Sequence, residues 1–301
     1  MNHYQPHRGI VHWVNKTFKH WSLLPAVLLF VALTVFPVMN LLRMSVSTIE
    51  FQGGTEVWSF TPLSNWQALV GDPGLNATLV NALIFVVVGV AVELVLGLAL
   101  ALLVGSMTRG KGVMRTLMII PILVPPVAIG NMFKLMYNYD FGLFNQMLGA
   151  VGVGPVSWLG STSLALWSVI LVDIWHWVPF VFLILFAAVE NLPREVLEAG
   201  RVDGATRWQL FRYVTLPLLM PAIIVALLFR SVLAFKAFDE VYLLTGGGPG
   251  TSSEILSLHL YKVFFEQNQM GYGAMLSVLT IAGVLIVLFL GRRLTAGAGA
   301  A

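Results

Sequence analysis

The chain has 301 residues, of which 58% are hydrophobic and only 10% are charged, with a mean hydropathy of +0.85. Soluble domains carry about 25% charged residues, so this composition excludes an ordinary soluble protein and predicts a polytopic membrane protein. A formal net charge of +3 is too small to indicate a nucleic-acid partner. The absence of cysteine excludes disulfides, thiolate metal sites and a cysteine nucleophile.

The N-terminal segment 1–22 does not resemble a cleavable signal peptide. Four histidines and three basic residues precede the first apolar run, which is longer than a signal core and lacks an obvious cleavage site. We expect the stretch 16–21, together with Trp13, to be able to form an interfacial helix ahead of the first span. The histidines are expected to be solvated, because no closed tetrahedral ligand set accompanies them.

Six later segments have the roughly 20 mostly apolar residues that a membrane-spanning helix needs. The predicted fold class is therefore an all-α polytopic membrane protein, with a membrane domain over 23–291, a loop at 190–215 that forms a helix-turn-helix, and a C-terminal tail at 292–301. The predicted spans are Leu23–Met44, Thr78–Val104, Arg115–Tyr137, Ser163–Val189, Leu216–Phe235 and Ala274–Leu290.

Basic residues predict the orientation of these spans. An even number of spans places both termini on one side, and Lys and Arg concentrate in cytoplasmic segments. If the N-terminus is cytoplasmic, the inner segments receive 12 of the 17 basic residues. These are Arg8, Lys16, Lys19, Arg109, Lys111, Arg115, Arg194, Arg201, Arg207, Arg212, Arg292 and Arg293. We therefore expect an inner-membrane protein with both termini in the cytoplasm.

The loop between the fourth and fifth spans begins with helix-start signals. Asn191 is expected to cap a short helix whose first turn contains Pro193 and Glu195, because proline and acidic residues suit the start of a helix. Gly200 and Gly204 bracket the expected turn.

A second short helix is expected after that turn. Thr206, followed three residues later by Gln209, forms a capping-box pattern. Trp208, Phe211 and Val214 form an apolar stripe at roughly helical spacing. The prediction is a helix-turn-helix on the cytoplasmic face with an exposed apolar knob.

This loop also carries a sequence motif with fixed spacing. Its matching residues are Glu198, Ala199, Asp203, Gly204, Ala205, Leu216 and Pro217. Their arrangement resembles the cytoplasmic coupling loop of ABC importer permeases, which reads Glu-Ala-Ala, two residues, Asp-Gly-Ala, and then Ile-x-Leu-Pro at a fixed distance. The chain departs from the pattern at Gly200 and at Val214. Glycine in place of alanine is expected to cost the local helix roughly 0.5–1 kcal/mol.

The resemblance implies a transport subunit that is not itself an enzyme. In the family the loop docks in a groove of an ATP-binding subunit, which implies that Glu198, Asp203 and Gly204 are docking residues and that Trp208 and Phe211 supply an apolar face. The chain has no Walker motif, so ATP and Mg would act on a partner ATPase dimer. The alternative is an ordinary re-entry loop packed on lipid headgroups, which does not require this spacing.

A glycine-rich segment follows the fifth span. It comprises Thr245, Gly246, Gly247, Gly248 and Pro249. Successive glycines before a proline disfavour helix and predict a mobile or tightly turned loop. The segment resembles the loop after span five in carbohydrate permeases of the same superfamily. That likeness implies a related second permease subunit and an extracytoplasmic solute-binding protein that faces this loop. It also implies a substrate among sugars, glycosides, polyols, glycerol-phosphate-like solutes and sulfonated sugars.

Ionisable residues inside predicted spans are candidates for the substrate path, because they are costly at membrane depth. Glu93, Asp173 and Arg230 lie within spans two, four and five. The further candidates are Asn131, Lys134, Trp175, His176, Trp177, Lys236 and Asp239. The tryptophans and His176 resemble a carbohydrate platform, and Arg230 and Lys134 could counter an anionic solute. The alternatives are that the three charges satisfy one another or the bundle backbone, and that the basic side chains snorkel.

Two other functions were weighed against an ATP-driven importer. An ion-coupled secondary carrier predicts inverted repeats with paired broken helices, and the halves of this sequence show no convincing similarity. An intramembrane enzyme would need a metal set or a nucleophile within the spans, and one histidine beside one aspartate falls short of either.

Overall fold

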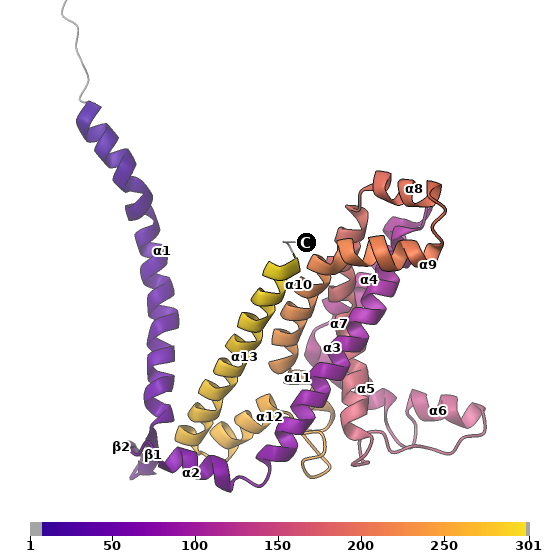
Figure 1. Cartoon of the computed structure of the whole chain (residues 1–301). Helices are drawn as coiled ribbons and strands as arrows, with labels where there is room; N and C mark the ends of the chain where they lie inside the picture. Colours follow the sequence, from indigo (N-terminus) through magenta and orange to yellow (C-terminus); the bar gives the residue numbers. More distant parts are fainter. Residues whose placement is uncertain (1–7, 299–301) are drawn as a thin grey trace, which may run out of the picture.

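The computed structural model describes residues 8–298, in which long helices run side by side and short elements gather at the two ends of the bundle (Figure 1). Five helices are long and apolar enough to cross a membrane, and a bent pair of helices can count as a sixth span. The long helices are α1 Arg8–Ser45, α3 Leu75–Gly105, α7 Ala165–Glu190, α10 Leu216–Phe235 and α13 Met270–Ala298. The all-α polytopic fold predicted from the sequence is confirmed.

Residues 8–45 form one uninterrupted helix. The predicted interfacial stretch 16–21 is therefore the first part of α1 rather than a separate helix, because no turn-forming pair interrupts the sequence before the span. The first seven residues of the N-terminal segment and the last three of the predicted tail lie outside the described residues. The remainder of that tail continues α13.

The predicted third span, 115–137, is two helices bent by 90°. These are α4 Lys111–Leu123 and α5 Pro126–Met136. The bend lies at Val124 and Pro125, whose ψ angles of 127° and 140° are extended rather than helical. A proline disfavours helical backbone in the residue before it and has no N–H to donate. The two successive prolines at 125 and 126 therefore end α4 and begin α5.

Short elements gather at the end of the bundle opposite α8, which we call the α12 end (Figure 1). A hairpin not predicted from the sequence follows α1, and its two strands are joined by Gly53 and Gly54, both with positive φ as such tight turns require. The elements there are β1 Ser47–Gln52, β2 Thr55–Phe60, α2 Ser64–Gly71, α12 Leu256–Tyr261 and the π-helical turn η2 Lys262–Glu266. Two further short helices, α6 Leu143–Ala150 and α11 Asp239–Leu244, follow α5 and α10.

The opposite end, which we call the α8 end, carries α8 Arg194–Val202 and α9 Arg207–Leu210. The second helix of the predicted helix-turn-helix is not separate, because α9 continues through the π-helical turn η1 Phe211–Thr215 into α10. In η1 the Leu216 N–H donates to the Phe211 carbonyl, five residues back. This wider turn directly precedes Pro217, which lacks an N–H for regular α-helical pairing.

Helices α3 and α7 pack against each other closely, at positions where α3 has glycine. A Cβ atom on Gly97 would lie 2.6 Å from Val181 Cγ1 and 3.1 Å from the Phe182 nitrogen. Gly105 stands similarly against Val189, at 2.7 Å. Small residues let membrane helices approach until their backbones are nearly in contact, and dispersion attraction then stabilises the pair. The α3–α7 pair forms the centre of the bundle.

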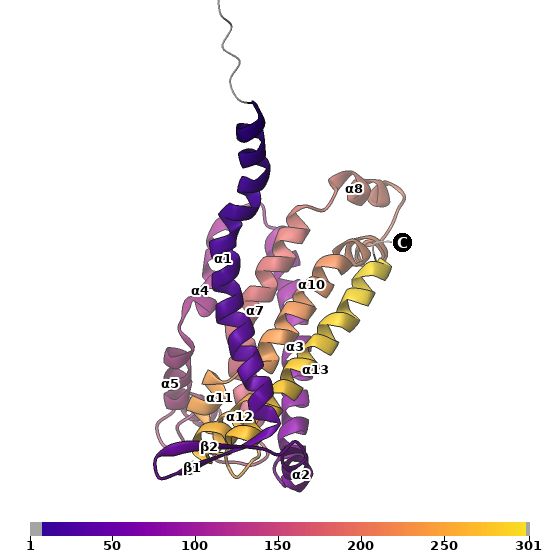
Figure 2. The same ribbon diagram turned by 90° about the vertical axis from the view of Figure 1, so that its left-hand side faces the viewer.

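Helix α1 is the exception to this packing. Within residues 22–45, the most apolar window of α1 has no buried residue. Leu33 and Phe36 are 68% and 73% exposed. The helix contacts α13 and β1. Figure 1 shows it standing away from the rest of the bundle toward the α8 end, and Figure 2 shows it from the side that faces away from the bundle. Most of its apolar surface is uncovered by the other described residues.

The α3–α7 contact generates a stability prediction. Gly97→Ala is expected to destabilise the protein by about 1–3 kcal/mol, because Val181 is branched at Cβ and the Phe182 backbone cannot move aside. The matched control is Gly283→Ala, at a helical glycine in α13 with nothing within 4 Å of the added methyl. Thermal unfolding of both variants in one detergent provides the measurement. Equal unfolding temperatures for the two variants would contradict the proposed close contact.

Candidate functional site

The turn between α8 and α9 is fixed by backbone hydrogen bonds. The Gly204 N–H donates to the Arg201 carbonyl at 3.1 Å, and the Ala205 N–H donates to the Gly200 carbonyl at 3.0 Å. Together they form the Schellman motif that ends many helices, with Asp203 as C-cap and Gly204 next. Gly204 has φ of +80°, a conformation that glycine adopts without steric cost. The Asp-Gly pair therefore specifies the shape of the turn.

Thr206 and Gln209 form the hydrogen bonds that begin the second helix. The Thr206 N–H donates to Gln209 Oε1 at 2.8 Å, and the Gln209 N–H donates to Thr206 Oγ1 at 3.3 Å. The capping box predicted from the sequence is therefore present. A Cβ on Gly200 would lie 2.6 Å from Leu210 Cδ1. The departure from the family pattern at Gly200 thus gives Leu210, only 9% exposed, room to pack between the two helices.

The start of α8 differs from the sequence prediction. Asn191 does not cap this helix but ends α7, where its Nδ2 donates to the Ala187 carbonyl at 2.7 Å. Pro193 is the N-cap of α8. The physical reason is that α7 extends through Glu190, which leaves Asn191 within reach of the last carbonyls of that helix.

The α8–α9 corner exposes the residues that the motif singled out. Trp208 is 67% exposed, and its ring lies tilted against that of Phe211, with ring centroids 5.6 Å apart. Glu198 and Asp203 are exposed, and neither carboxylate has a hydrogen bond or ion pair within residues 8–298. Because backbone groups already form the turn, these acids are available to another molecule. Ala199 is exposed as well, and Ala205, Leu216 and Pro217 lie in the turn and at the start of α10.

A second site is an ionic cluster buried among α3, α7 and α10. Arg230 is fully buried, and its Nε and Nη2 donate to the two Glu93 oxygens at 2.5 and 2.9 Å. Arg230 Nη2 also donates to Asp173 Oδ2. Two carboxylates thus face one guanidinium, which a planar arginine fork can bridge. We call Glu93, Asp173 and Arg230 the ionic cluster.

Two aromatic side chains of α7 lie beside the ionic cluster. The Arg230 guanidinium lies 4.9 Å from the centre of the Trp177 ring. The neighbouring His176 is buried, and its Nδ1 lies 2.8 Å from Glu240 Oε1 on α11. Asp173 Oδ1 and Arg230 Nη1 are buried without a hydrogen-bond partner among the described residues. The cluster and the His176–Glu240 pair therefore connect four helices, and two polar atoms remain free for a small polar partner.

The other predicted substrate-path residues do not join the ionic cluster. Trp175 points to the other side of α7, where it packs edge-on against Phe133 and lines an apolar cavity of about 570 Å³ at the α4–α5 bend. The remaining four, Asn131, Lys134, Lys236 and Asp239, are exposed on the surface of this chain. Asn131 Nδ2 donates to the Val127 carbonyl of its own helix. The structure thus divides the predicted substrate-path residues into a buried group and an exposed group.

The glycine-rich segment is a compact turn at the α12 end. Gly246 and Gly247 have φ of +57° and +89°. Thr245 Oγ1 accepts hydrogen bonds from the Gly247 N–H at 3.1 Å and from Ser253 Oγ at 2.8 Å. Of the two sequence expectations for this segment, mobile or tightly turned, this geometry corresponds to the second. We call residues 245–254 the glycine loop, and it includes Gly248 and Pro249.

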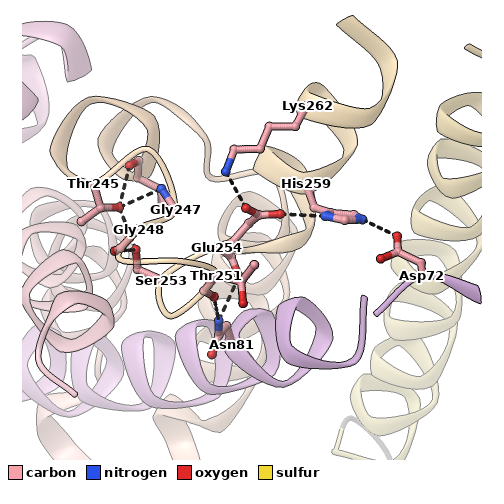
Figure 3. A network of polar contacts seen from close by, with 11 residues as sticks. Asp72, Asn81, Thr245, Gly247, Gly248, Thr251, Ser253, Glu254, His259 and Lys262 are labelled. Atoms are coloured by element: carbon pink, nitrogen blue, oxygen red, sulfur yellow. Dashed lines mark hydrogen bonds and ion pairs between the residues drawn. The ribbon is translucent and has the colours of Figure 1, made fainter. Parts of the chain in front are cut away.

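A polar network, labelled in Figure 3, joins the glycine loop to the start of α3. His259 Nδ1 lies 2.7 Å from Glu254 Oε1, and His259 Nε2 lies 2.8 Å from Asp72 Oδ2. Lys262 Nζ donates to Glu254 Oε2 at 2.5 Å. We call Asp72, Glu254, His259 and Lys262 the His259 network. Asn81 Nδ2 makes a second link, donating to the Thr251 and Glu254 carbonyls.

The contacts within the network shift the pKa values of three of its members. Burial disfavours the charged form of each, but hydrogen bonds to Glu254 and Asp72 outweigh it and raise the pKa of His259. By the same balance, hydrogen bonds from Tyr272 and His259 hold the pKa of Asp72 below its ordinary value. The hydrogen bonds from His259 and Lys262 likewise lower the pKa of Glu254.

Sequence reasoning missed Glu240 and the whole His259 network. Asp239 was singled out, but its neighbour Glu240 is the buried one. Asp72 carried the most readable signal, because Asp-Pro-Gly before an apolar run suits a helix start, and its Oδ1 accepts from the Gly74 and Leu75 N–H groups. The partners of His259 lie up to 187 positions away, and no local pattern connects them.

Comparison with known proteins decides the family. The model of the family described as "Binding-protein-dependent transport system inner membrane component" matches residues 93–298, which is more than half of the chain. The chain belongs to this family. The match includes both the α8–α9 corner and the ionic cluster.

Relatives of known name have similar length and fold. The chain is 40% identical over 201 residues to a trehalose/maltose transport system permease protein, MalF, of Thermococcus litoralis, covering 67% of this chain and 68% of that one. It is 33% identical to the sulfoquinovosyl glycerol transport system permease protein SmoG of Agrobacterium fabrum, covering 86% and 84%. Two structures of bacterial alginate ABC transporters share the fold, one of them with an alginate pentasaccharide-bound periplasmic protein. Their TM-scores are 0.82 and 0.80 at 19% and 20% identity, and they cover 95% and 94% of this chain and 98% and 96% of theirs.

The ionic cluster of this family member generates a second prediction. Arg230→Met is expected to destabilise the protein by about 3–5 kcal/mol, because it leaves two buried carboxylates without a counter-charge. Adding Glu93→Gln and Asp173→Asn should restore part of the loss, since both replacements remove the uncompensated charges. Tryptophan-fluorescence melting in one detergent gives the comparison.

The control for this series is Lys134→Met, which removes an exposed basic residue of α5 and should change stability by less than about 0.5 kcal/mol. If the variant with all three substitutions melts at a lower temperature than the Arg230→Met variant, the charges of the cluster are not balanced as described.

Proposed function

We propose that this chain is the transmembrane permease subunit of an ATP-binding-cassette importer for a carbohydrate or related solute, coupled to a separate ATPase through Glu198–Pro217. The observation that carries the proposal is the α8–α9 corner. Its shape is fixed by its own backbone, whereas its carboxylates have no hydrogen-bond or ion-pair partner among the described residues and the Trp208 ring is exposed beside Phe211. A rigid corner with unpaired acids and an exposed aromatic ring suits docking to another protein.

The basic residues support a cytoplasmic position for the α8 end. Arg194, Arg201, Arg207 and Arg212 lie in or beside α8, α9 and η1. Positive residues favour the cytoplasmic side of short loops. With α8 in the cytoplasm, both termini are cytoplasmic and the α12 end faces outward. An ATPase that carries ATP and Mg could then reach the corner.

The connections of the corner suggest how ATPase closure reaches the transport path. α8 follows α7 after three residues, and α9 is continuous with α10 through η1. Asp173 on α7 and Arg230 on α10 are joined within the ionic cluster. A displacement of the corner would therefore act on both helices that hold the cluster, and the two would tilt together between inward-open and outward-open states.

The surface of α1 supports a related second permease subunit as a partner. A span whose side chains are exposed in the isolated chain can face lipid or another apolar helix. The exposed polar side chains Asn131, Lys134, Lys236 and Asp239 would be costly against lipid wherever they lie at membrane depth. A second subunit would cover them and enclose a polar path between the two.

The names of the relatives support the substrate class. Two of the relatives are named as permeases for trehalose/maltose and for sulfoquinovosyl glycerol. In this chain Trp177 and His176 lie beside the ionic cluster, and flat aromatic faces with polar groups suit sugar rings. A solute-binding protein would deliver the substrate at the α12 end, near residues 245–249. Screening purified binding protein against glycosides, polyols and sulfonated sugars would identify the substrate.

No observation favours the two rival functions. A secondary carrier predicts paired broken helices, and the α4–α5 pair is the one bent pair found among the described residues. An intramembrane enzyme would need a reactive constellation, and the ionic cluster is instead an arginine between two carboxylates.

The coupling role can be tested at Gly204. Gly204→Val is expected to abolish co-purification with the ATPase and to reduce ATP-dependent uptake at least about tenfold, because a β-branched residue at φ of +80° would force the turn to change. Asp203→Ala should weaken association while leaving the turn intact. The measurements are the ATPase-to-permease ratio after affinity purification and uptake into proteoliposomes with binding protein.

The matched control is Gly53→Val, which places the same residue at a positive φ with nothing within 4 Å, but in the hairpin at the α12 end. It should retain ATPase association. If wild-type protein expressed with its neighbouring genes never associates with an ATPase, or if Gly204→Val transports normally, the proposal fails.

A further inference from the structure

His259 contacts a carboxylate through each of its two ring nitrogens. Glu254 lies 2.7 Å from Nδ1 and Asp72 lies 2.8 Å from Nε2. A neutral imidazole carries one N–H, whereas the imidazolium ion carries two. In the neutral form one nitrogen lone pair would face a carboxylate at hydrogen-bond distance, which is repulsive. The geometry therefore fits a protonated His259.

The two carboxylates belong to segments that are distant in the sequence. Asp72 caps the start of α3 through the Gly74 and Leu75 N–H groups and accepts a hydrogen bond from Tyr272 Oη at 2.8 Å. Glu254 ends the glycine loop. Protonated His259 on α12 thus joins the end of the glycine loop to the start of α3.

Charge in the His259 network is balanced only when His259 is protonated. The groups that face it are Asp72 from the α2–α3 corner and Glu254 from the glycine loop, with Lys262 of η2 and Tyr272 of α13 on the far sides of these carboxylates. Its members are mostly buried, with side-chain exposures of 5% for Glu254, 8% for His259 and 13% for Asp72. Loss of the histidine proton would leave two buried carboxylates facing one lysine.

A polar cavity of about 730 Å³ borders the network and gives water access to it. Its lining includes Gly250, Thr251 and Gln267 as well as the four network residues. The cavity offers the glycine loop space to move if Glu254 is released. No three acidic or histidine side chains in residues 8–298 are placed to hold a metal ion, so protonation is the chemistry that the site offers.

We propose that the His259 network is a proton-controlled clamp that holds the glycine loop against the start of α3 and releases it when His259 loses its proton. The Asn81 bonds to the Thr251 and Glu254 carbonyls do not titrate, but neutral hydrogen bonds are roughly half as strong as charge-assisted ones. After release they hold the loop only part of the time, so the loop exchanges between an attached and a detached position while the helices around it stay folded. The consequence for transport rests on the proposed function, in which this loop faces the binding protein. The clamp itself does not depend on that function.

The pH range of the clamp follows from the directions of the pKa shifts. The pKa of His259 is raised, so its contribution is complete below the ordinary histidine value of about 6.5 and is lost as pH rises through the raised value. The pKa values of Asp72 and Glu254 are lowered, so their contribution is complete above ordinary carboxyl values and is lost as pH falls through the lowered ones. The clamp is therefore closed at mildly acidic pH and opens as pH rises through the raised pKa of His259.

The natural absence of cysteine allows a direct test in the full-length chain. Spin labels on Val70→Cys and Thr251→Cys, two exposed positions on α2 and the glycine loop, would report the distance between them in nanodiscs. We expect one narrow distance distribution at pH below about 6.5. A second population with a longer label-to-label distance should appear as pH is raised. The pH at which it reaches half of its final size should equal the pH at which His259 is half protonated.

Two variants make the test specific. His259→Gln in the labelled protein should show the longer population at every pH, because a glutamine amide has one donor nitrogen and cannot donate to both carboxylates along this axis. Gln267→Ala, which alters the same cavity without touching the network, should keep the wild-type pH response. The nitrogen NMR shifts of the His259 ring, assigned by difference from His259→Gln, should show both nitrogens protonated at pH below about 6.5.

The outcomes separate the clamp from the transport proposal. A neutral His259 ring at pH below about 6.5, or a label distance that does not change while His259 titrates, would overturn the clamp whatever the chain transports. Uptake assays of the complete transporter come second: wild-type uptake should change as His259 loses its proton and should equal that of His259→Gln at alkaline pH, whereas uptake by His259→Gln should lack this pH step. Failure of ATPase association would reject the transport role without affecting the label distances.

Discussion

An arginine that is fully buried in a membrane bundle requires a counter-charge, because moving an isolated charge out of water is very costly. Arg230 meets this requirement with carboxylates from two other helices, Glu93 of α3 and Asp173 of α7. The contact fixes the relative position of α3, α7 and α10 near Glu93. Between Glu93 and the α8 end, the glycines of α3 allow α7 to approach closely. The rest of the bundle depends on this ionic cluster, since α4, α11 and α13 all pack against these three helices.

The α8–α9 corner extends this rigid unit beyond the apolar part of the bundle. A Schellman motif at Gly204 and a capping box at Thr206 follow each other directly, so the corner has no flexible residue between its two helices. Leu210 packs against Gly200 and fills the angle between them. Because α9 continues into α10, a force on the corner would, in the proposed function, be delivered along a helix to Arg230. Local hydrogen bonds thus shape the corner, and the buried ion pairs determine which helices move with it.

The sequence predicted those parts of the structure that short-range patterns encode. Composition indicated the membrane class, and Thr206 with Gln209 predicted a helix start that the structure contains. The pair Pro125–Pro126 was a local signal for the α4–α5 bend, but the apolar run across it was interpreted as one span. Asn191 was assigned to the wrong helix because both neighbouring helix ends offer it partners. Glu240, Asp72 and His259 could not be found, since their partners lie 64 and 187 positions away and only the packed fold brings them together.

The two ends of the molecule are held by different kinds of interaction, local at the α8 end and long-range at the α12 end. At the α8 end, backbone hydrogen bonds within about six residues hold the corner, so its shape is insensitive to pH and to movements elsewhere in the bundle. At the α12 end, the glycine loop is held by side chains from distant segments, and the raised pKa of His259 sets the pH above which one of these side chains loses its proton. In the proposed transporter, the corner would meet the ATPase with the same shape in every cycle, which suits the first arrangement. The glycine loop would admit a ligand-bearing binding protein and then release it, which suits the second, because its attachment can be broken without unfolding the helices around it.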